Sequence, residues 1–303
     1  MSADTPSKES AKEHRSGYIA LIGNPNAGKS TLMNRFLGSR ISITTHKPQT
    51  TRHQILGIYS DPDSQMIFLD TPGVLTPAYE LQEVMMRFVD KAKKDADIIL
   101  FIVDGTDATP PRQGMEFLSA ISKPVWLVIN KSDRAPEKQA AKLEQEIREK
   151  VTIANSYLIS ALHGDGTEKL LNDLRLAIPP GPAYYPGDIL SEQPMRFFAA
   201  ELIREQIFLQ FHEEIPYSCT VEVIQYEEQE ELDMISANIV VNRKSQKGML
   251  IGKKGKAIRK LGISARESIE TFTGRKVYLD LHVKVREKWR EKADWVRNLG
   301  YSG

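Results

Sequence analysis

The stretch Gly23-Asn24-Pro25-Asn26-Ala27-Gly28-Lys29-Ser30 decides the fold of the N-terminal half of this chain. It matches GxxxxGK[ST], a pattern that joins a β-strand to an α-helix and cradles phosphates. The apolar run Tyr18–Ile22 precedes it, and Ser30–Leu37 can continue as the helix. The glycines let backbone N–H groups curl around a phosphate, and the helix N-terminus adds the positive end of its dipole. A chance glycine-rich turn is the weaker alternative. The candidate phosphate-binding residues are Gly23, Asn24, Pro25, Asn26, Ala27, Gly28, Lys29, Ser30 and Thr31.

Short apolar runs alternate with helical segments on both sides of this loop. Such alternation predicts an α/β domain with a mainly parallel sheet and helices on both faces. Near-continuous apolar runs are typical of strands buried on both faces. The expected strands are Tyr18–Ile22, Ile55–Tyr59, Met66–Leu69, Ile98–Val103, Val125–Ile129 and Tyr157–Ile159, and one expected helix is Ala135–Val151.

The segment 178–188 contains four prolines and two glycines, so it cannot continue a helix and is typical of an interdomain linker. The order of elements changes after it, which predicts a smaller α+β domain. We expect helices over 194–211, 255–272 and 286–297, and strands over 217–226, 232–242 and 275–285. The predicted organisation is a disordered tail (1–16), a nucleotide-binding domain (17–178), a linker (179–192) and a second domain (193–303).

Three short motifs follow the phosphate loop, each at the end of an expected strand, where α/β sheets bind ligands. Asp70-Thr71-Pro72-Gly73 offers a carboxylate for Mg²⁺ and an amide for a γ-phosphate. Asn130-Lys131-Ser132-Asp133 offers a carboxylate that can accept two hydrogen bonds from guanine, while Asn130 braces the loop. Ser160-Ala161-Leu162 offers the Ala161 amide to the guanine oxygen. Adenine cannot supply the hydrogen bonds that Asp133 accepts, so GTP and GDP are the expected ligands rather than ATP.

The polar segment 41–54 lies between the phosphate loop and Asp70 and is predicted to be a mobile switch. One of its threonines should close on Mg²⁺, and we favour Thr51 over Thr50. The expected metal ligands are therefore Ser30, Thr51 and Asp70. Lys29, Thr51, Asp70 and Gly73 are the expected catalytic residues. His46 and His53 are better interpreted as solvated or packing histidines than as bases.

Val74 follows Gly73, where small signalling GTPases have a glutamine that orients the attacking water. Valine cannot make that hydrogen bond, so hydrolysis should be slow. This arrangement resembles the GTPases with an apolar residue at that position. Some of them use K⁺, held partly by an asparagine of the phosphate loop, and Asn26 matches that asparagine. Potassium stimulation is therefore a hypothesis.

The second domain contains Ile251-Gly252-Lys253-Lys254-Gly255, the IGxxG signature of a KH domain, in which a GxxG loop clamps single-stranded nucleic acid. Residues 243–260 hold eight basic residues and no acid, the local footprint of an RNA-binding surface. A glycine hinge with ordinary surface lysines is the alternative. The expected RNA-binding residues are Lys247, Ile251, Gly252, Lys253, Lys254, Gly255, Lys256 and Arg259.

The overall composition sets few other constraints. The net charge is only +1, so a nucleic-acid surface must be a local patch. The one cysteine, Cys219, lies in a run that alternates apolar residues, and we expect a buried structural thiol. No apolar stretch is long enough to span a membrane, and the polar N-terminus has no signal core. We expect a cytoplasmic monomer.

A phosphate loop, a guanine motif and a C-terminal KH loop in one chain resemble the Era family of GTPases, and the resemblance covers about residues 18–297. It implies a type II KH domain, binding near the 3′ end of 16S ribosomal RNA, a role in 30S subunit assembly and possible peripheral association with the inner membrane. The competing interpretations are a membrane-associated signalling or cell-cycle GTPase with a secondary KH domain, and a P-loop kinase or ATPase, which Asp133 argues against.

Overall fold

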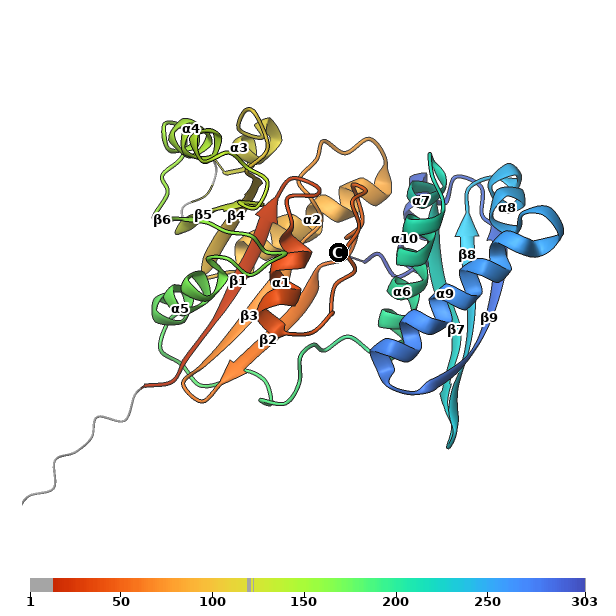
Figure 1. Cartoon of the computed structure of the whole chain (residues 1–303). Helices are drawn as coiled ribbons and strands as arrows, with labels where there is room; N and C mark the ends of the chain where they lie inside the picture. The colour runs from red at the N-terminus through yellow and green to blue at the C-terminus, as the bar shows by residue number, and fades with distance from the viewer. Residues whose placement is uncertain (1–12, 119–120, 122, 303) are drawn as a thin grey trace, which may run out of the picture.

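The computed structural model describes residues 13–118, 121 and 123–302. Its N-terminal part is built on a six-stranded sheet with the order β2-β3-β1-β4-β5-β6 (Figure 1). Neighbouring strands are parallel except β2 and β3, which are antiparallel. The expected α/β class is therefore correct. The strands are β1 (Arg15–Gly23), β2 (Ile55–Asp61), β3 (Ser64–Asp70), β4 (Ile98–Asp104), β5 (Val125–Asn130) and β6 (Asn155–Leu158).

Strand β1 begins at Arg15, two residues before the expected start of the domain at residue 17. The backbone N–H of Arg15 donates to the carbonyl of Asp63, and its side chain donates to the carbonyl of Ile178. These bonds extend the strand into the segment that we expected to be disordered. The rest of that predicted tail, residues 1–12, lies outside the described residues.

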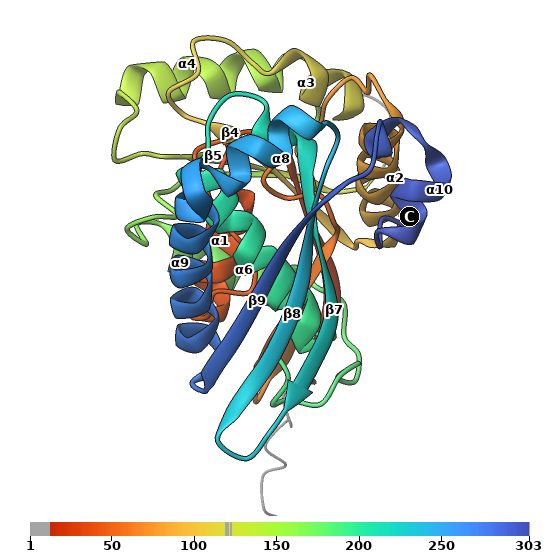
Figure 2. The same cartoon turned by 90° about the vertical axis from the view of Figure 1, so that its right-hand side faces the viewer.

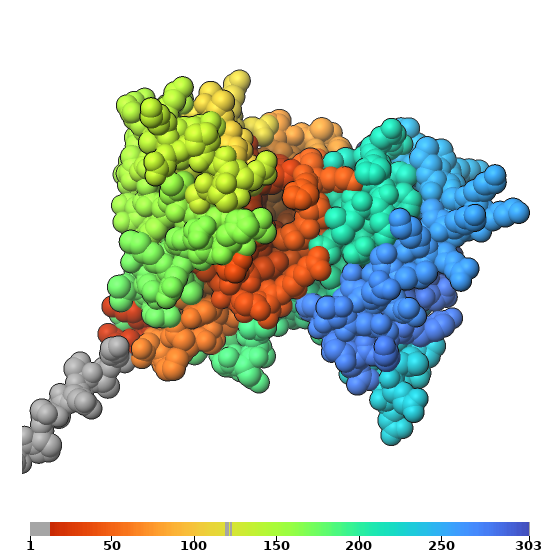
Figure 3. All heavy atoms as spheres, viewed as in Figure 1, coloured from red at the N-terminus to blue at the C-terminus, as the bar shows by residue number. Residues whose placement is uncertain are grey.

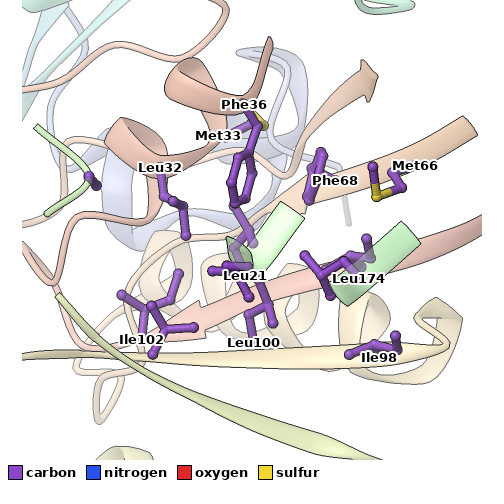
Figure 4. Packing of buried hydrophobic residues seen from close by; sticks show 14 of the residues in the cluster. Leu21, Leu32, Met33, Phe36, Met66, Phe68, Ile98, Leu100, Ile102 and Leu174 are labelled. Carbon is purple, nitrogen blue, oxygen red and sulfur yellow. The ribbon is translucent and has the colours of Figure 1, made fainter. Parts of the chain in front are cut away.

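Helices cover both faces of this sheet. Helices α1 (Lys29–Leu37) and α5 (Thr167–Ala177) pack on one face, where Leu32, Met33 and Phe36 meet the strands (Figure 4). Helices α2 (Glu80–Asp95), α3 (Arg112–Leu118) and α4 (Glu137–Arg148) pack on the other. Because strands β1 and β4 are buried from both sides, their central runs Tyr18–Ile22 and Ile98–Val103 are apolar, as expected for a parallel sheet.

The C-terminal part is a three-stranded sheet with the order β7-β8-β9, in which β7 and β8 are antiparallel and β8 and β9 parallel. Helices α6 and α9 pack on the face turned toward the first sheet (Figures 1 and 2). The elements are α6 (Met195–Gln210), α7 (Ile215–Ser218), β7 (Cys219–Glu228), β8 (Leu232–Val241), α8 (Lys244–Ile251), a 3₁₀ turn (Lys253–Gly255), α9 (Lys256–Thr273), β9 (Lys276–Val285), a 3₁₀ turn (Trp289–Glu291) and α10 (Ala293–Asn298).

The single helix expected over 286–297 is wrong. Lys288 adopts a left-handed φ of 55° and Lys292 an extended conformation, so the chain forms a 3₁₀ turn and then the short helix α10. Trp289 is fully buried there, and Trp295 packs beside it against helix α2. Both tryptophans therefore take part in the apolar cluster that joins helix α2 to the last elements of the chain.

The two parts are in direct contact. Apolar residues of α2 pack with Trp289, Val296 and Tyr301, and Ile43 joins the core of the second sheet. The connecting segment lies along the first sheet, where the N–H of Ile58 donates to the carbonyl of Leu190. Cys219 is fully buried, as expected of a structural thiol. No helix of the described residues is both long and apolar enough to cross a membrane.

Candidate nucleotide site and nucleic-acid interface

A cavity of about 650 Å³ opens at the carboxyl ends of the parallel strands. Figure 3 shows the hollow, framed by red and orange atoms of the first third of the chain and by yellow-green atoms. All four predicted nucleotide motifs contribute to its lining, together with residues 43–51. The volume falls in the range of small-molecule sites. The fold therefore brings together motifs that lie more than a hundred residues apart.

The phosphate loop has the backbone that its glycines permit. Gly28 has a φ of 97°, and a Cβ there would lie 2.1 Å from Nδ2 of Asn130, so only glycine fits. The ammonium group of Lys29 is buried under the loop and donates to the carbonyls of Gly23 (3.1 Å) and Asn24 (2.9 Å). Burial lowers the pKa of Lys29 to about 8, although the nearby Asp70 carboxylate opposes the shift. A bound phosphate would therefore stabilise the charged form of Lys29 and raise its pKa.

The three predicted metal ligands lie together. Ser30 Oγ donates to Asp70 Oδ2 (2.6 Å) and lies 2.9 Å from Thr51 Oγ1. Ser42 Oγ also donates to Asp70 Oδ2 (2.7 Å). The other oxygen, Asp70 Oδ1, is buried and has no hydrogen-bond partner among the described residues. This set of hard oxygen atoms, with one buried acceptor unsatisfied, fits Mg²⁺ and its bound water.

Thr50 and Thr51 face different ways. Thr51 turns its hydroxyl to Ser30, whereas the hydroxyl of Thr50 donates to the carbonyl of Lys47 (2.7 Å) and lies 2.6 Å from Thr45 Oγ1. This geometry supports Thr51 as the threonine of the metal site. His53 is packed among aromatic rings outside the cavity lining, and His46 lies in the lining.

The motif Asn130–Asp133, which is predicted to bind guanine, has its carboxylate residue in the cavity lining. Ser160 Oγ donates to Asp133 Oδ1 (2.6 Å), and this hydrogen bond lowers the pKa of Asp133, so the carboxylate is ionised at neutral pH. Asn130 braces two loops, because its Nδ2 donates to the carbonyl of Ala27 and its Oδ1 accepts from the amide of Ala161. The amide that we expected to be free for guanine is thus bound to Asn130 in this structure. Lys131 pairs with Asp104 at the rim.

Gly73 lines the cavity beside Pro25 of the phosphate loop, whereas the neighbouring Val74 is not part of the lining. Val74 is buried, and its N–H donates to the carbonyl of Gly23 (3.0 Å). Asn26 uses its Nδ2 to donate to the carbonyl of His46 (2.8 Å), which ties the phosphate loop to the switch segment. Leu162 is 63% exposed at the rim, beside Asp133.

The predicted RNA-binding loop has the geometry of a tight backbone clamp. It follows helix α8, and Gly252 has a φ of 71°; a Cβ there would lie 2.6 Å from that of Ala257. Lys254 at the tip also has a left-handed φ, of 53°. Lys253, Lys254 and Lys256 are exposed. The predicted basic residues of 243–260 form no salt bridge with any described residue, so their charges face solvent.

An open groove continues from this loop. Its first part is lined by Lys247 and Ile251 of α8, Ile258 of α9, and strand β9. Its second part runs on along α9 past Arg259 to Tyr278, which is 56% exposed. A groove with an apolar floor and basic rims suits a single nucleic-acid strand. Of the eight predicted residues, Lys247 and Ile251 line the first part of the groove and Arg259 the second, while the other five form the loop and the start of α9.

Comparisons with known proteins agree with both domain types. Residues 18–131 match the family model described as 50S ribosome-binding GTPase, and residues 214–290 match the KH domain model. GTPase Era of Geobacter metallireducens is 41% identical over 293 residues, which cover 95% of this chain and 98% of that protein. The chain belongs to the Era family of GTPases.

Other relatives of the Era family extend the likeness. The chloroplastic GTPase ERA-like protein of Arabidopsis thaliana is 44% identical, over 96% of this chain and 69% of its own length. The crystal structure of a variant Aquifex aeolicus Era bound to GDP and AlF₄⁻ superposes with a TM-score of 0.91 at 36% identity and covers 95% of this chain. Era in complex with MgGDPNP and nucleotides 1506–1542 of 16S ribosomal RNA gives 0.91 at 35% identity and 96% coverage. In both pairs the whole of the other chain is covered.

Sequence reasoning missed two groups of residues in this Era-family protein. His282 and Lys284 of strand β9 line the groove. The charge pattern of the loop gave no indication that this strand lies beside it. Helix α6 also contacts the switch segment, because Arg204 and Glu205 form hydrogen bonds with its backbone. The charged residues within α6 were the available signal, but their partners Thr50 and Thr44 lie 154 and 161 residues away in the sequence.

Proposed function

We propose that this protein is a GTP-binding and GTP-hydrolysing switch that binds single-stranded 16S ribosomal RNA near its 3′ end and assists assembly of the 30S subunit. The observation that carries the proposal is the pairing of two sites in one chain: a cavity with an ionised Asp133, and a KH loop with exposed lysines. The Era complex with MgGDPNP and 16S ribosomal RNA supports the same pair of ligands. We also propose the division into a nucleotide-binding domain (17–178), a linker (179–192) and a KH domain (193–303), with β1 extended to Arg15.

The phosphates of GTP would lie over the N-terminus of α1, where Lys29 supplies positive charge. Mg²⁺, when bound by Ser30, Thr51 and Asp70, neutralises negative charge that develops on the phosphates. Asp133 accepts hydrogen bonds from guanine, and Asn130 keeps the loops of the base site together. The Gly73 amide would donate to the γ-phosphate. Val74 offers no side-chain hydrogen bond to a water molecule, so unaided hydrolysis is slow, and K⁺ near Asn26 is the proposed accelerator.

RNA binding would use the loop as a backbone clamp and the groove as a base platform. Lys253 and Lys254 meet phosphates at the tip, and the N-terminus of α9 adds its dipole. Lys247, Lys256 and Arg259 extend the positive rim, while Ile251 forms part of the floor. Because phosphate contacts release counterions, the affinity should fall steeply as salt rises.

The test has one part for each site. The first compares hydrolysis of GTP and ATP with Mg²⁺ present and absent. The second compares binding of a single-stranded oligonucleotide from the 3′ end of 16S ribosomal RNA by the wild type and by Lys253→Asp with Lys254→Asp. A matched control, Lys138→Asp with Lys150→Asp, changes two exposed lysines of the other domain. GTP-selective hydrolysis, with RNA binding lost only in the loop variant, supports the proposal. RNA binding that survives in the loop variant contradicts the KH assignment, and binding to anionic vesicles instead would favour the membrane-associated alternative.

A further inference from the structure

Helix α6 of the second domain presents a charged stripe to the switch segment. Glu201, Arg204, Glu205 and Phe208 recur at intervals of three and four residues, which places them on one face of the helix. All four are buried, and Glu205 and Phe208 are fully so. The opposite face, with Ala199 and Ile203, packs in the core of the second sheet. The charged groups of this stripe are satisfied partly by one another and partly by the backbone of the other domain.

The central member of the stripe is Arg204. Its Nε donates to Glu201 Oε1 (2.8 Å), a second nitrogen pairs with Glu201 Oε2, and the same nitrogen donates to the backbone carbonyl of Thr50. The ring of Phe208 lies under the guanidinium, 5.4 Å from centroid to Cζ. Burial alone would raise the pKa of Glu201, but the charge and hydrogen bonds of Arg204 hold it below its usual value. The pair is therefore ionised and fixed in one geometry.

Thr50 is the residue before Thr51, whose hydroxyl lies at the metal site. The residue after Thr51 is held in the same way. Arg52 is fully buried and donates to the carbonyls of Cys219 (2.6 Å) and Pro216 (2.9 Å) in the second domain. Thr51 thus lies between two residues that are bound to the KH domain, while its own side chain faces the nucleotide site.

Glu205 extends the contact to the start of the switch. Its carboxylate accepts from the backbone N–H of Thr44 (3.1 Å) and pairs with Arg40. The loop from Ser39 to Gln54 has no helix or strand of its own. A loop without a helix or strand has many conformations in isolation, so contacts from outside the loop help to select the one in which Thr51 meets Ser30.

We propose that Glu201 and Arg204 are positioning residues for GTP hydrolysis, which hold the Thr51 hydroxyl at the Ser30–Asp70 edge of the nucleotide site from the KH domain. The inference rests on the proposed GTPase function and adds that the active conformation is completed by the second domain. A buried ion pair is an expensive way to gain stability, whereas it fixes a geometry well. Because Thr51 acts at the metal and γ-phosphate end, the effect should concern GTP and leave GDP binding largely unchanged.

The test is the double variant Glu201→Gln with Arg204→Met, which removes both charges together and leaves neither buried alone. We expect the affinity for a non-hydrolysable GTP analogue to fall by about tenfold, with GDP affinity within about twofold of wild type. We also expect slower hydrolysis and a higher Mg²⁺ concentration for half-maximal rate. The matched control, Asp233→Asn with Arg275→Met, removes an ion pair of the same domain that does not touch the switch segment. It should leave the ratio of analogue affinity to GDP affinity, the rate of GTP hydrolysis and the Mg²⁺ concentration for half-maximal rate at wild-type values.

An unchanged ratio of analogue to GDP affinity and an unchanged Mg²⁺ requirement in the folded double variant would overturn the inference. Thermal unfolding establishes whether that variant folds. If it does not, Arg204→Lys keeps the charge beside Glu201 but replaces the planar guanidinium with one ammonium group. A selective loss of analogue affinity in Arg204→Lys supports the positioning role, and wild-type values contradict it. A wild type that fails to hydrolyse GTP would instead contradict the proposed function.

Discussion

The imidazole ring of His53 stacks on the phenol ring of Tyr301, with centroids 4.4 Å apart and planes inclined by 12°. His53 lies near the end of the switch segment, and Tyr301 belongs to the second domain. The hydroxyl of Tyr301 lies 2.8 Å from Thr220 Oγ1 on strand β7. Phe88 of α2 and Phe197 of α6 close around the same imidazole. The contact therefore joins the switch, helix α2 and the KH domain through one neutral ring.

This packing predicts a pH dependence of stability. Burial lowers the pKa of His53 to about 4, so the unfolded chain binds a proton there at a higher pH than the folded chain. Stability should therefore fall as the pH drops from about 6.5 toward 4, by at most about 3 kcal/mol from this group. In His53→Phe, which keeps a stacking ring, this part of the loss should disappear in denaturant titrations. The exposed His212, changed to Phe, serves as the control. An identical pH profile for wild type and His53→Phe would contradict the prediction.

The lowered pKa of Lys29 leads us to predict proton uptake when a nucleotide binds. Burial lowers its pKa to about 8 in the free protein, and nucleotide phosphates favour its charged form and so raise that pKa. Binding should take up a fraction of a proton near pH 8.5 and almost none through this group near pH 7, with affinity falling as the pH rises above about 8. Calorimetry of GDP binding in buffers with different ionisation enthalpies measures the uptake. Equal uptake at both pH values would be inconsistent with a buried, shifted lysine.

The position of Asp133 leads us to predict specificity for guanine. Its ionised carboxylate accepts two hydrogen bonds from guanine, and Asn at this position would present an N–H group to one of those donors. Asp133→Asn should lose roughly hundredfold or more in GDP affinity, which corresponds to about 3 kcal/mol for two charge-assisted bonds. It should gain affinity for xanthosine diphosphate. Competition binding against a fluorescent nucleotide checks both changes, and retained guanine selectivity in the variant would count against the assigned base site.

Asn26 and Val74 predict a dependence on monovalent cations. Without a side chain to orient water at Val74, turnover should be faster in potassium than in sodium buffer at equal ionic strength. Asn26→Ala should remove that difference while GDP affinity changes little, because the phosphates are bound by backbone amides. Single-turnover hydrolysis in the two salts provides the measurement. Equal rates in both buffers for the wild type would refute the potassium hypothesis.

The nucleotide site was largely predictable because short local motifs contain its functional residues. Lys29, Asp70 and Asp133 follow strands whose apolar runs are unmistakable, and parallel strands bring their ends to one edge. The hydrogen bond from the Ala161 amide to Asn130 was not predictable, because it depends on the relative height of two loops. The helix expected over 286–297 failed because its periodicity does not reveal the left-handed turn at Lys288.

The interface between the domains was the least predictable part. Arg204 and Glu201 in sequence resemble an ordinary surface pair at helical spacing, and nothing local identifies Thr50 as their partner. The groove along β9 was hidden for the same reason, since Tyr278 and Lys284 become groove residues only when β9 pairs with β8 beside α9. Long-range pairing, rather than local pattern, determines both.

The most direct test of the account compares RNA binding in two nucleotide states. Protein loaded with a non-hydrolysable GTP analogue and protein loaded with GDP are each titrated with a single-stranded oligonucleotide from the 3′ end of 16S ribosomal RNA, at two salt concentrations. We predict tighter binding in the analogue state, because closure of Thr51 and docking of the KH domain are linked through Arg204, with a salt dependence that reports several phosphate contacts. Absence of binding in both states would contradict the KH loop as an RNA clamp, and equal binding in both states would contradict the switch.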